Sequence, residues 1–170
     1  MTAKTKVRRT PTVARSKAAA RRSTKGGMRI ENWMAKPVIT VRPLDSVADA
    51  KSLLERHRIN QLPVVVNGRL VGIVTDRDLR NATDAVRVSG TSAGVTLGRE
   101  DVAPEKITVE TVMSAKVMKL RPQDTVEEAA SLMHGERIGG IPVVDRKNLV
   151  GIITRSDVLK AFIALSGEPS

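Results

Sequence analysis

The pattern of hydrophobic and polar positions in the first half of the chain predicts a helix, a β-hairpin and a second helix. Apolar residues at helical spacing indicate a helix over 47–57. Two β-branched runs follow, at 62–66 and 69–75, and the Asn67-Gly68 pair between them is typical of a two-residue hairpin turn. A second helix is predicted from Asp76, and an extended stretch over 38–41 precedes the first.

The same pattern returns 79 positions later without insertion or deletion. An internal repeat indicates two copies of one supersecondary unit, each with an apolar face that the other can cover. Two copies are too few for a solenoid, so the pattern predicts a pair related by a pseudo-twofold axis. The identical pairs include Met34 and Met113, Pro43 and Pro122, Ala50 and Ala129, Pro63 and Pro142, Gly72 and Gly151, Thr75 and Thr154, and Asp78 and Asp157.

The second copy is predicted to contain a helix from Val126, strands over 141–144 and 149–154, and a closing helix through Leu165. Both first helices begin with capping-box sequences, Ser46 with Asp49 and Thr125 with Glu128. In place of Asn-Gly, the second hairpin carries the four residues 145–148, which predict a looser turn.

The net charge of +11 is concentrated at the N-terminus. Residues 1–29 hold ten lysines and arginines and no acid, which leaves 19 basic against 18 acidic residues elsewhere. Residues 1–27 lack hydrophobic periodicity and are predicted to form a disordered tail. Four interpretations remain for this tail: it binds nucleic acid or an acidic partner, it is a transit peptide, it is an artefact with Met28 as the true start, or it only improves solubility.

The remaining chain divides into a first repeat over 28–80, a loop or linker over 81–106, and a second repeat over 107–166. The absence of cysteine excludes disulfides, thiolate metal sites and a cysteine nucleophile. No apolar run is long enough to span a membrane and no secretory signal is present, so a cytoplasmic location is expected.

An enzymatic function has little support in the sequence. His57 and His134 occupy non-equivalent positions in the two copies, and neither belongs to a metal or catalytic motif. We therefore predict no catalytic residue and no metal site.

The most informative local motif is Gly-Ile-Val-Thr-Asp-Arg-Asp at 72–78, matched by Gly-Ile-Ile-Thr-Arg-Ser-Asp at 151–157. Each copy lies where a strand ends and a helix begins, and a helix N-terminus favours a phosphate. The Asp carboxylate offers two acceptors that suit the hydroxyls of a ribose. A capping box explains Thr-x-x-Asp equally well, and the two roles are compatible. The retained glycine is interpreted as room for a ligand or another backbone to approach.

Together with Pro63-Val64-Val65 and Pro142-Val143-Val144, these motifs resemble tandem CBS domains, the Bateman module, over about residues 28–165. The resemblance implies an α+β fold of two β-α-β-β-α repeats packed as a CBS pair. It also implies two clefts between the repeats that commonly hold adenosine-based ligands such as AMP, ATP or S-adenosylmethionine.

Carried over to this chain, the resemblance assigns each cleft a ribose side from one repeat and a base side from the other. Core packing is the alternative for each of the apolar candidates. For the first cleft the residues are Thr154 and Asp157 with Ile39, Ile59 and Gln61; for the second they are Thr75 and Asp78 with Met118, Ile138 and Gly140; Arg58 and Arg137 are the candidates for phosphate contacts.

The two clefts are not expected to be equivalent. Asn60-Gln61 in the first repeat becomes Gly139-Gly140 in the second, and Pro37 becomes Lys116. If only one cleft binds a ligand, we expect it to be the Thr154/Asp157 cleft, because the Asn60 and Gln61 amides can bond to a base edge.

The sequence thus predicts a stand-alone, non-catalytic CBS-pair protein that senses an adenine nucleotide or related ligand and acts on a protein target. The resemblance implies a homodimer, formed through the helices expected to end at Arg80 and Leu165. The alternative is a nucleic-acid-associated dimeric protein that binds through its basic tail.

Overall fold

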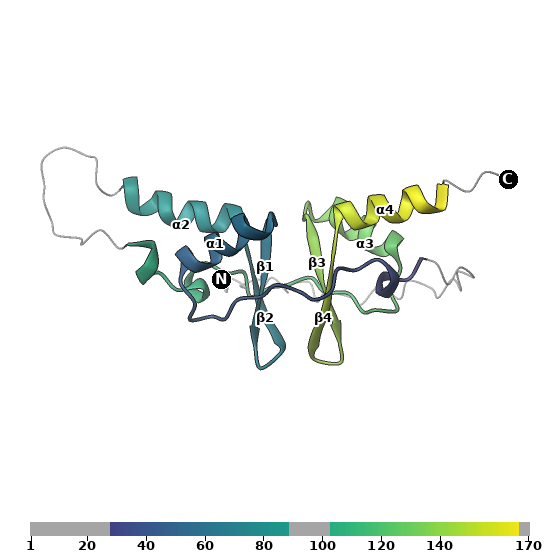
Figure 1. Cartoon of the computed structure of the whole chain (residues 1–170), viewed down its shortest axis with the longest axis horizontal. Coiled ribbons are helices and arrows are strands. Elements are labelled where there is room, and N and C mark those ends of the chain that lie inside the picture. Colours follow the sequence, from purple (N-terminus) through teal and green to yellow (C-terminus); the bar gives the residue numbers. More distant parts are fainter. Residues whose placement is uncertain (1–27, 89–102, 167–170) are drawn as a thin grey trace, which may run out of the picture.

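A computed structural model of the 170-residue chain describes residues 28–88 and 103–166. The predicted α+β architecture is confirmed, with two halves that each carry two helices on one side of a β-hairpin (Figure 1). The elements are α1 (Val47–His57), β1 (Gln61–Val66), β2 (Arg69–Thr75), α2 (Asp76–Val88), α3 (Val126–Gly135), β3 (Gly140–Asp145), β4 (Asn148–Thr154) and α4 (Arg155–Ser166).

The two predicted helix caps form as expected. The Asp49 backbone N–H donates to Ser46 Oγ over 3.0 Å at the start of α1. At the start of α3, Thr125 and Glu128 form a complete capping box. Because the first backbone N–H groups of a helix have no partner within it, each cap satisfies donors that packing alone leaves open.

The two hairpins have loops of the same length, which corrects the predicted looser turn in the second copy. Asn67 and Gly68 both have positive φ in the first turn, as expected for Asn-Gly. In the second turn Asp145 pairs with Asn148, so only two residues connect the strands, and Arg146 takes the left-handed conformation at φ 56°. The strand register therefore decides the loop length, although the turn sequence does not favour it.

The strands form one antiparallel sheet in the order β1-β2-β4-β3. Each hairpin pairs along its full length, whereas β2 and β4 are joined at Arg69 and Asn148 near the turns. The predicted first strand of each repeat is reduced to a single parallel bridge, Val41 to Val64 and Leu120 to Val143.

The N-terminal segment of each repeat packs against the other repeat. The Ile30 backbone N–H donates to Asp124 O over 2.9 Å, and the Ala35 N–H donates to Ile152 O over 2.8 Å. Reciprocally, the Val109 N–H donates to Asp45 O over 2.9 Å. In Figure 1 the purple N-terminal segment accordingly lies beside the half that contains α3 and α4. The two repeats of the sequence are therefore not two separate packing units.

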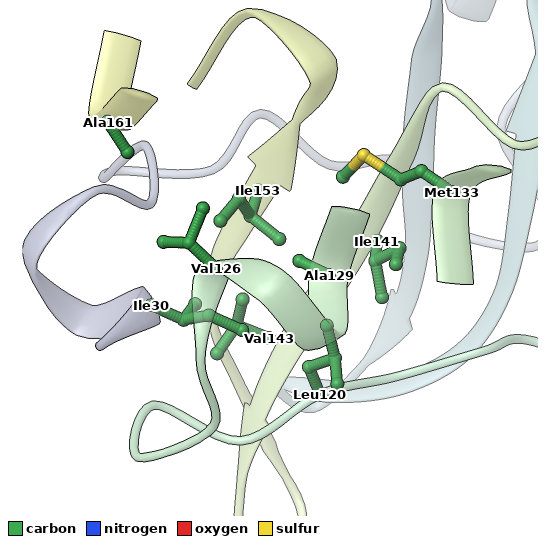
Figure 2. Packing of buried hydrophobic residues seen from close by; sticks show 9 residues of the cluster. All are labelled: Ile30, Leu120, Val126, Ala129, Met133, Ile141, Val143, Ile153 and Ala161. Carbon is green, nitrogen blue, oxygen red and sulfur yellow. The ribbon is translucent and has the colours of Figure 1, made fainter. Parts of the chain in front are cut away.

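Each half contains one hydrophobic core, and the exchanged segments contribute to both. Ile30 is fully buried in the core of the second half, where it lies close to Val143 and Val126 (Figure 2). Val109 is fully buried in the core of the first half, with Leu62 and Val74. Aliphatic side chains from both repeats thus complete each core.

Helix α2 continues to Val88 instead of ending at Arg80, so the first part of the predicted 81–106 linker is helical. The predicted tail, residues 1–27, lies outside the described residues, as do residues 89–102. Within the described ranges, no helix combines the length and apolarity that crossing a membrane requires.

Candidate ligand-binding cleft

A cleft of about 600 Å³ lies between the two repeats, with walls from both. This volume falls within the range of pockets that hold small molecules. The first repeat contributes 35, 37–39, 58–61 and 63, and the second contributes 139, 152, 154–157 and 160. Every residue predicted for the Thr154/Asp157 cleft lines it, together with the phosphate candidate Arg58.

Thr154 and Asp157 are positioned by the junction of β4 and α4. Asp157 Oδ2 accepts hydrogen bonds from the Thr154 backbone N–H over 3.0 Å and from Thr154 Oγ1 over 2.6 Å. The carboxylate is buried, with the residue 7% exposed, and Oδ1 accepts from Lys160 Nζ over 3.3 Å. The carboxylate therefore caps the helix and still directs one oxygen to a side chain that lines the cleft.

Thr75 and Asp78 repeat this arrangement at the junction of β2 and α2. Asp78 Oδ2 accepts from the Thr75 N–H over 2.9 Å and from Thr75 Oγ1 over 2.7 Å, and the Asp78 N–H donates to Thr75 Oγ1 over 3.3 Å. The capping role is thus common to both copies. It follows that the hydrogen bonds between Thr and Asp do not by themselves distinguish a ligand site.

The apolar base-side candidates combine packing with exposure to the cleft. Ile39 and Ile59 are partly buried, pack against the first core and line the cleft. Ile138 packs against the second core, and Met118 is 42% exposed. Ile39 and Ile59, which were predicted for this cleft, therefore line it. Met118 and Ile138 were predicted for the Thr75/Asp78 cleft and are not among the residues that line this one.

Gln61 and Gly140 occupy equivalent positions in the two repeats and contact each other. The Gln61 amide fills the space in front of Gly140, where an added Cβ would lie 3.0 Å from Gln61 Cδ and closer still to Nε2. Nε2 is buried and, among the described residues, has no hydrogen-bond partner. The Gln61 side chain of the first repeat thus occupies the space that Gly140 of the second repeat leaves open.

Gly72 and Gly151 make room for the exchanged segment of the other repeat. At Gly72 the predicted approach of another backbone is confirmed, because an added Cβ would lie 3.2 Å from Ser114 O. An added Cβ at Gly151 would overlap the side chain of Met34, and one at Gly72 would meet Met113, with Cγ at 3.2 Å. Each glycine therefore accommodates the methionine of an exchanged segment. The repeated glycine is explained by packing and gives no argument for ligand binding.

Arg58 and Arg137 each follow the first helix of their repeat and adopt the left-handed conformation, with φ of 53° and 56°. Arg58 lines the cleft between the repeats. Arg137 instead lines a separate hollow of about 490 Å³ between α3 and α4, together with Met133 and Leu159. The equivalent backbone positions thus place the two guanidinium groups in different surroundings.

Two cations of the cleft, Arg155 and Lys160, were missed by the sequence analysis. Helical spacing was the signal that could have found Lys160, because it lies three residues after Asp157 on the same face of α4. Within the described part of the chain, no three histidines, aspartates or glutamates gather in a way that could hold a metal ion.

Comparison with known proteins identifies the family of both repeats. The CBS domain family model matches residues 30–84 and 109–164. CBS domain-containing protein YhcV of Bacillus subtilis is 33% identical over 129 residues, which cover 76% of this chain and 81% of that protein.

Two solved structures show the same fold. The CBS domain pair of protein MJ0100, solved with 5′-methylthioadenosine and S-adenosyl-L-methionine, has a TM-score of 0.65 at 29% identity, with 81% of this chain and 97% of that chain covered. CBSX2 in complex with AMP has a TM-score of 0.67 at 27% identity, with 82% and 98% covered. Since the family model matches both repeats, this protein belongs to the CBS domain family and carries two CBS domains in tandem.

Proposed function

We propose that this protein is a non-catalytic regulatory module that binds an adenine nucleotide or a related adenosyl ligand in the Thr154/Asp157 cleft. The observation that carries the proposal is the composition of the two walls: a buried carboxylate beside a helix N-terminus on one, and partly buried isoleucines on the other. A ribose suits the first wall and an apolar-faced base suits the second. The complexes of MJ0100 and CBSX2 contain ligands of this class.

The proposed function requires no chemical step in the cleft. The cleft walls come from different repeats, so an occupant contacts both of them at once. A ligand shifts the relation of the two repeats only by its differential affinity for two arrangements. The shift is then passed to a protein target through the surface of the pair.

We expect AMP, ATP or S-adenosylmethionine to raise the melting temperature of the full chain in a thermal-shift panel. A ligand at one hundred times its Kd stabilises the folded state by about 2.7 kcal/mol, which corresponds to about 5–10 °C for a domain of this size. Guanosine and cytidine nucleotides serve as controls for general anion effects. An unchanged melting temperature with every adenosyl ligand, confirmed by calorimetry, would contradict the proposal.

The proposal includes a homodimer that uses the outer face of α4. Leu159, Phe162 and Ile163 are 61%, 67% and 68% exposed on this face. The hollow between α3 and α4, lined in part by Met133 and Val158, lies next to them. Exposed apolar side chains beside an apolar hollow on one face are what a twofold, self-complementary interface needs.

We expect Phe162→Glu to convert the dimer to a monomer, because it places a charge at the centre of this apolar face. Light scattering coupled to size exclusion measures the mass. Leu44→Glu is the matched control, because Leu44 is 75% exposed and lies far from α4 in the sequence. A monomeric mass for the unaltered chain, or a dimer that survives Phe162→Glu, would refute this interface.

A further inference from the structure

The Thr154/Asp157 cleft carries an excess of positive charge. Arg58, Arg155 and Lys160 line it together with the single carboxylate of Asp157. Lys160 pairs with Asp157, and within the described part of the chain neither arginine has an ion-pair partner. Two guanidinium groups are thus left to interact with whatever occupies the cleft.

The equivalent positions around Thr75 and Asp78 have a different charge. Arg155 corresponds to Asp76, which forms a 2.6 Å ion pair with Arg80, and Lys160 corresponds to Asn81. Arg155 and Lys160 therefore do not belong to the shared scaffold of the two repeats, whereas Arg58 has Arg137 at the equivalent position. Arg155 and Lys160 line the cleft whose other wall carries Ile39 and Ile59.

Lys160 forms an exposed ion pair with Asp157, for which a ligand can compete. Its Nζ lies 3.3 Å from Asp157 Oδ1, and its side chain is 71% exposed, so it moves at little cost. A ribose hydroxyl that bonds to Oδ1 competes with this ammonium group. A phosphate chain in the same cleft gives the displaced ammonium a new anionic partner.

We propose that the cleft selects nucleotides with two or three phosphates, and that Lys160 leaves Asp157 for the phosphate chain when the ribose binds. Arg58 and Arg155 bind the same chain from opposite walls of the cleft. This inference rests on the proposed function and names its ligand class. The sulfonium and thioether ligands of the MJ0100 complex lack the phosphates that these cations would bind.

Calorimetry of the full chain with adenosine, AMP, ADP and ATP tests the selection, in EDTA buffer at fixed ionic strength. Each added cation contact to phosphate is expected to tighten binding about tenfold. ADP or ATP should therefore bind at least about a hundredfold more tightly than adenosine. Equal affinities for adenosine and ATP would overturn the inference and leave the proposed function intact, whereas binding of no adenosyl ligand would overturn both.

Lys160→Asn, which installs the residue found at equivalent position 81, tests the exchange of partners. The variant should lower ATP affinity about tenfold. It should also raise adenosine affinity about two- to fivefold, because an exposed ion pair no longer competes for Asp157. A loss of ATP affinity together with a gain of adenosine affinity is specific to the exchange of partners, since damage to the fold would lower the affinity for both ligands. Parallel losses would refute it.

Arg58→Gly removes a guanidinium group at a position where glycine suits the backbone, because φ is 53°. The expected result is a roughly tenfold loss of ATP affinity with unchanged adenosine affinity. Arg137→Gly is the matched control, because Arg137 has a similar φ of 56° but lines a different hollow. Equal losses in both variants would assign the effect to the helix end and contradict a phosphate contact.

Discussion

Ile30→Ala is expected to lower the free energy of unfolding by about 2–5 kcal/mol, as is usual when a fully buried isoleucine is truncated. Ile30 is 0% exposed in the core of the second half, although it belongs to the first repeat in sequence. The loss should therefore appear first in the second half. Urea denaturation measures the loss in free energy of unfolding. Hydrogen exchange, compared between the hairpin of β3 and β4 and the hairpin of β1 and β2, shows which half of the molecule is destabilised.

Two controls make this prediction specific. Glu31→Ala changes an exposed residue of the same turn and should alter stability by less than about 0.5 kcal/mol. Val109→Ala removes the reciprocal contact and should reduce protection of β1 and β2 first. If Ile30→Ala instead exposed β1 and β2 first, the exchange of segments between the two halves would be refuted.

Asp157→Ala is expected to weaken nucleotide binding by about 1.5–3 kcal/mol, or about 10- to 150-fold in Kd, because a hydrogen bond to a charged acceptor contributes that much. Asp157 is the buried carboxylate of the 600 Å³ cleft, and its Oδ1 accepts a hydrogen bond from Lys160, which also lines the cleft. Isothermal titration calorimetry with ATP measures the change directly, independently of any loss of helix stability.

Asp78→Ala is the matched control for this experiment. Asp78 makes the same two hydrogen bonds to Thr75 that Asp157 makes to Thr154, so both variants lose the same cap, a cost of about 1 kcal/mol in stability. Only Asp157 lines the cleft. Binding lost in Asp78→Ala and kept in Asp157→Ala would reject the choice of cleft.

The local elements followed from the sequence because short-range physics determines them. Helix α1 has the predicted bounds, Val47–His57, since Ser46 supplies the cap and apolar residues recur at helical spacing. Asn67-Gly68 formed its two-residue turn because both residues tolerate positive φ. The second turn was mispredicted because pairing of β3 with β4 places Arg146 in a conformation that its own preference does not indicate.

The candidate site was predictable in outline because the repeat places equivalent residues at equivalent positions. Five residues that were assigned to one cleft from the sequence line one cleft in the structure: Thr154 and Asp157 on one wall, and Ile39, Ile59 and Gln61 on the other. Arg58 and Arg137 occupy equivalent backbone positions, and the structure places Arg58 at this cleft and Arg137 at the hollow between α3 and α4. Their surroundings differ because the side chains around them come from other elements.

By itself, the sequence determined the paired architecture, the capped helices and the family, because these depend on periodicity and on residues close together in the chain. Only the tertiary structure showed that Ile30 and Val109 complete each other's cores, that Gly72 and Gly151 accommodate methionines, and that Arg155 and Lys160 face the cleft. The physical reason is that these contacts join segments tens of residues apart. These segments are brought together by the packing of the two repeats against each other, which local conformational preferences do not determine.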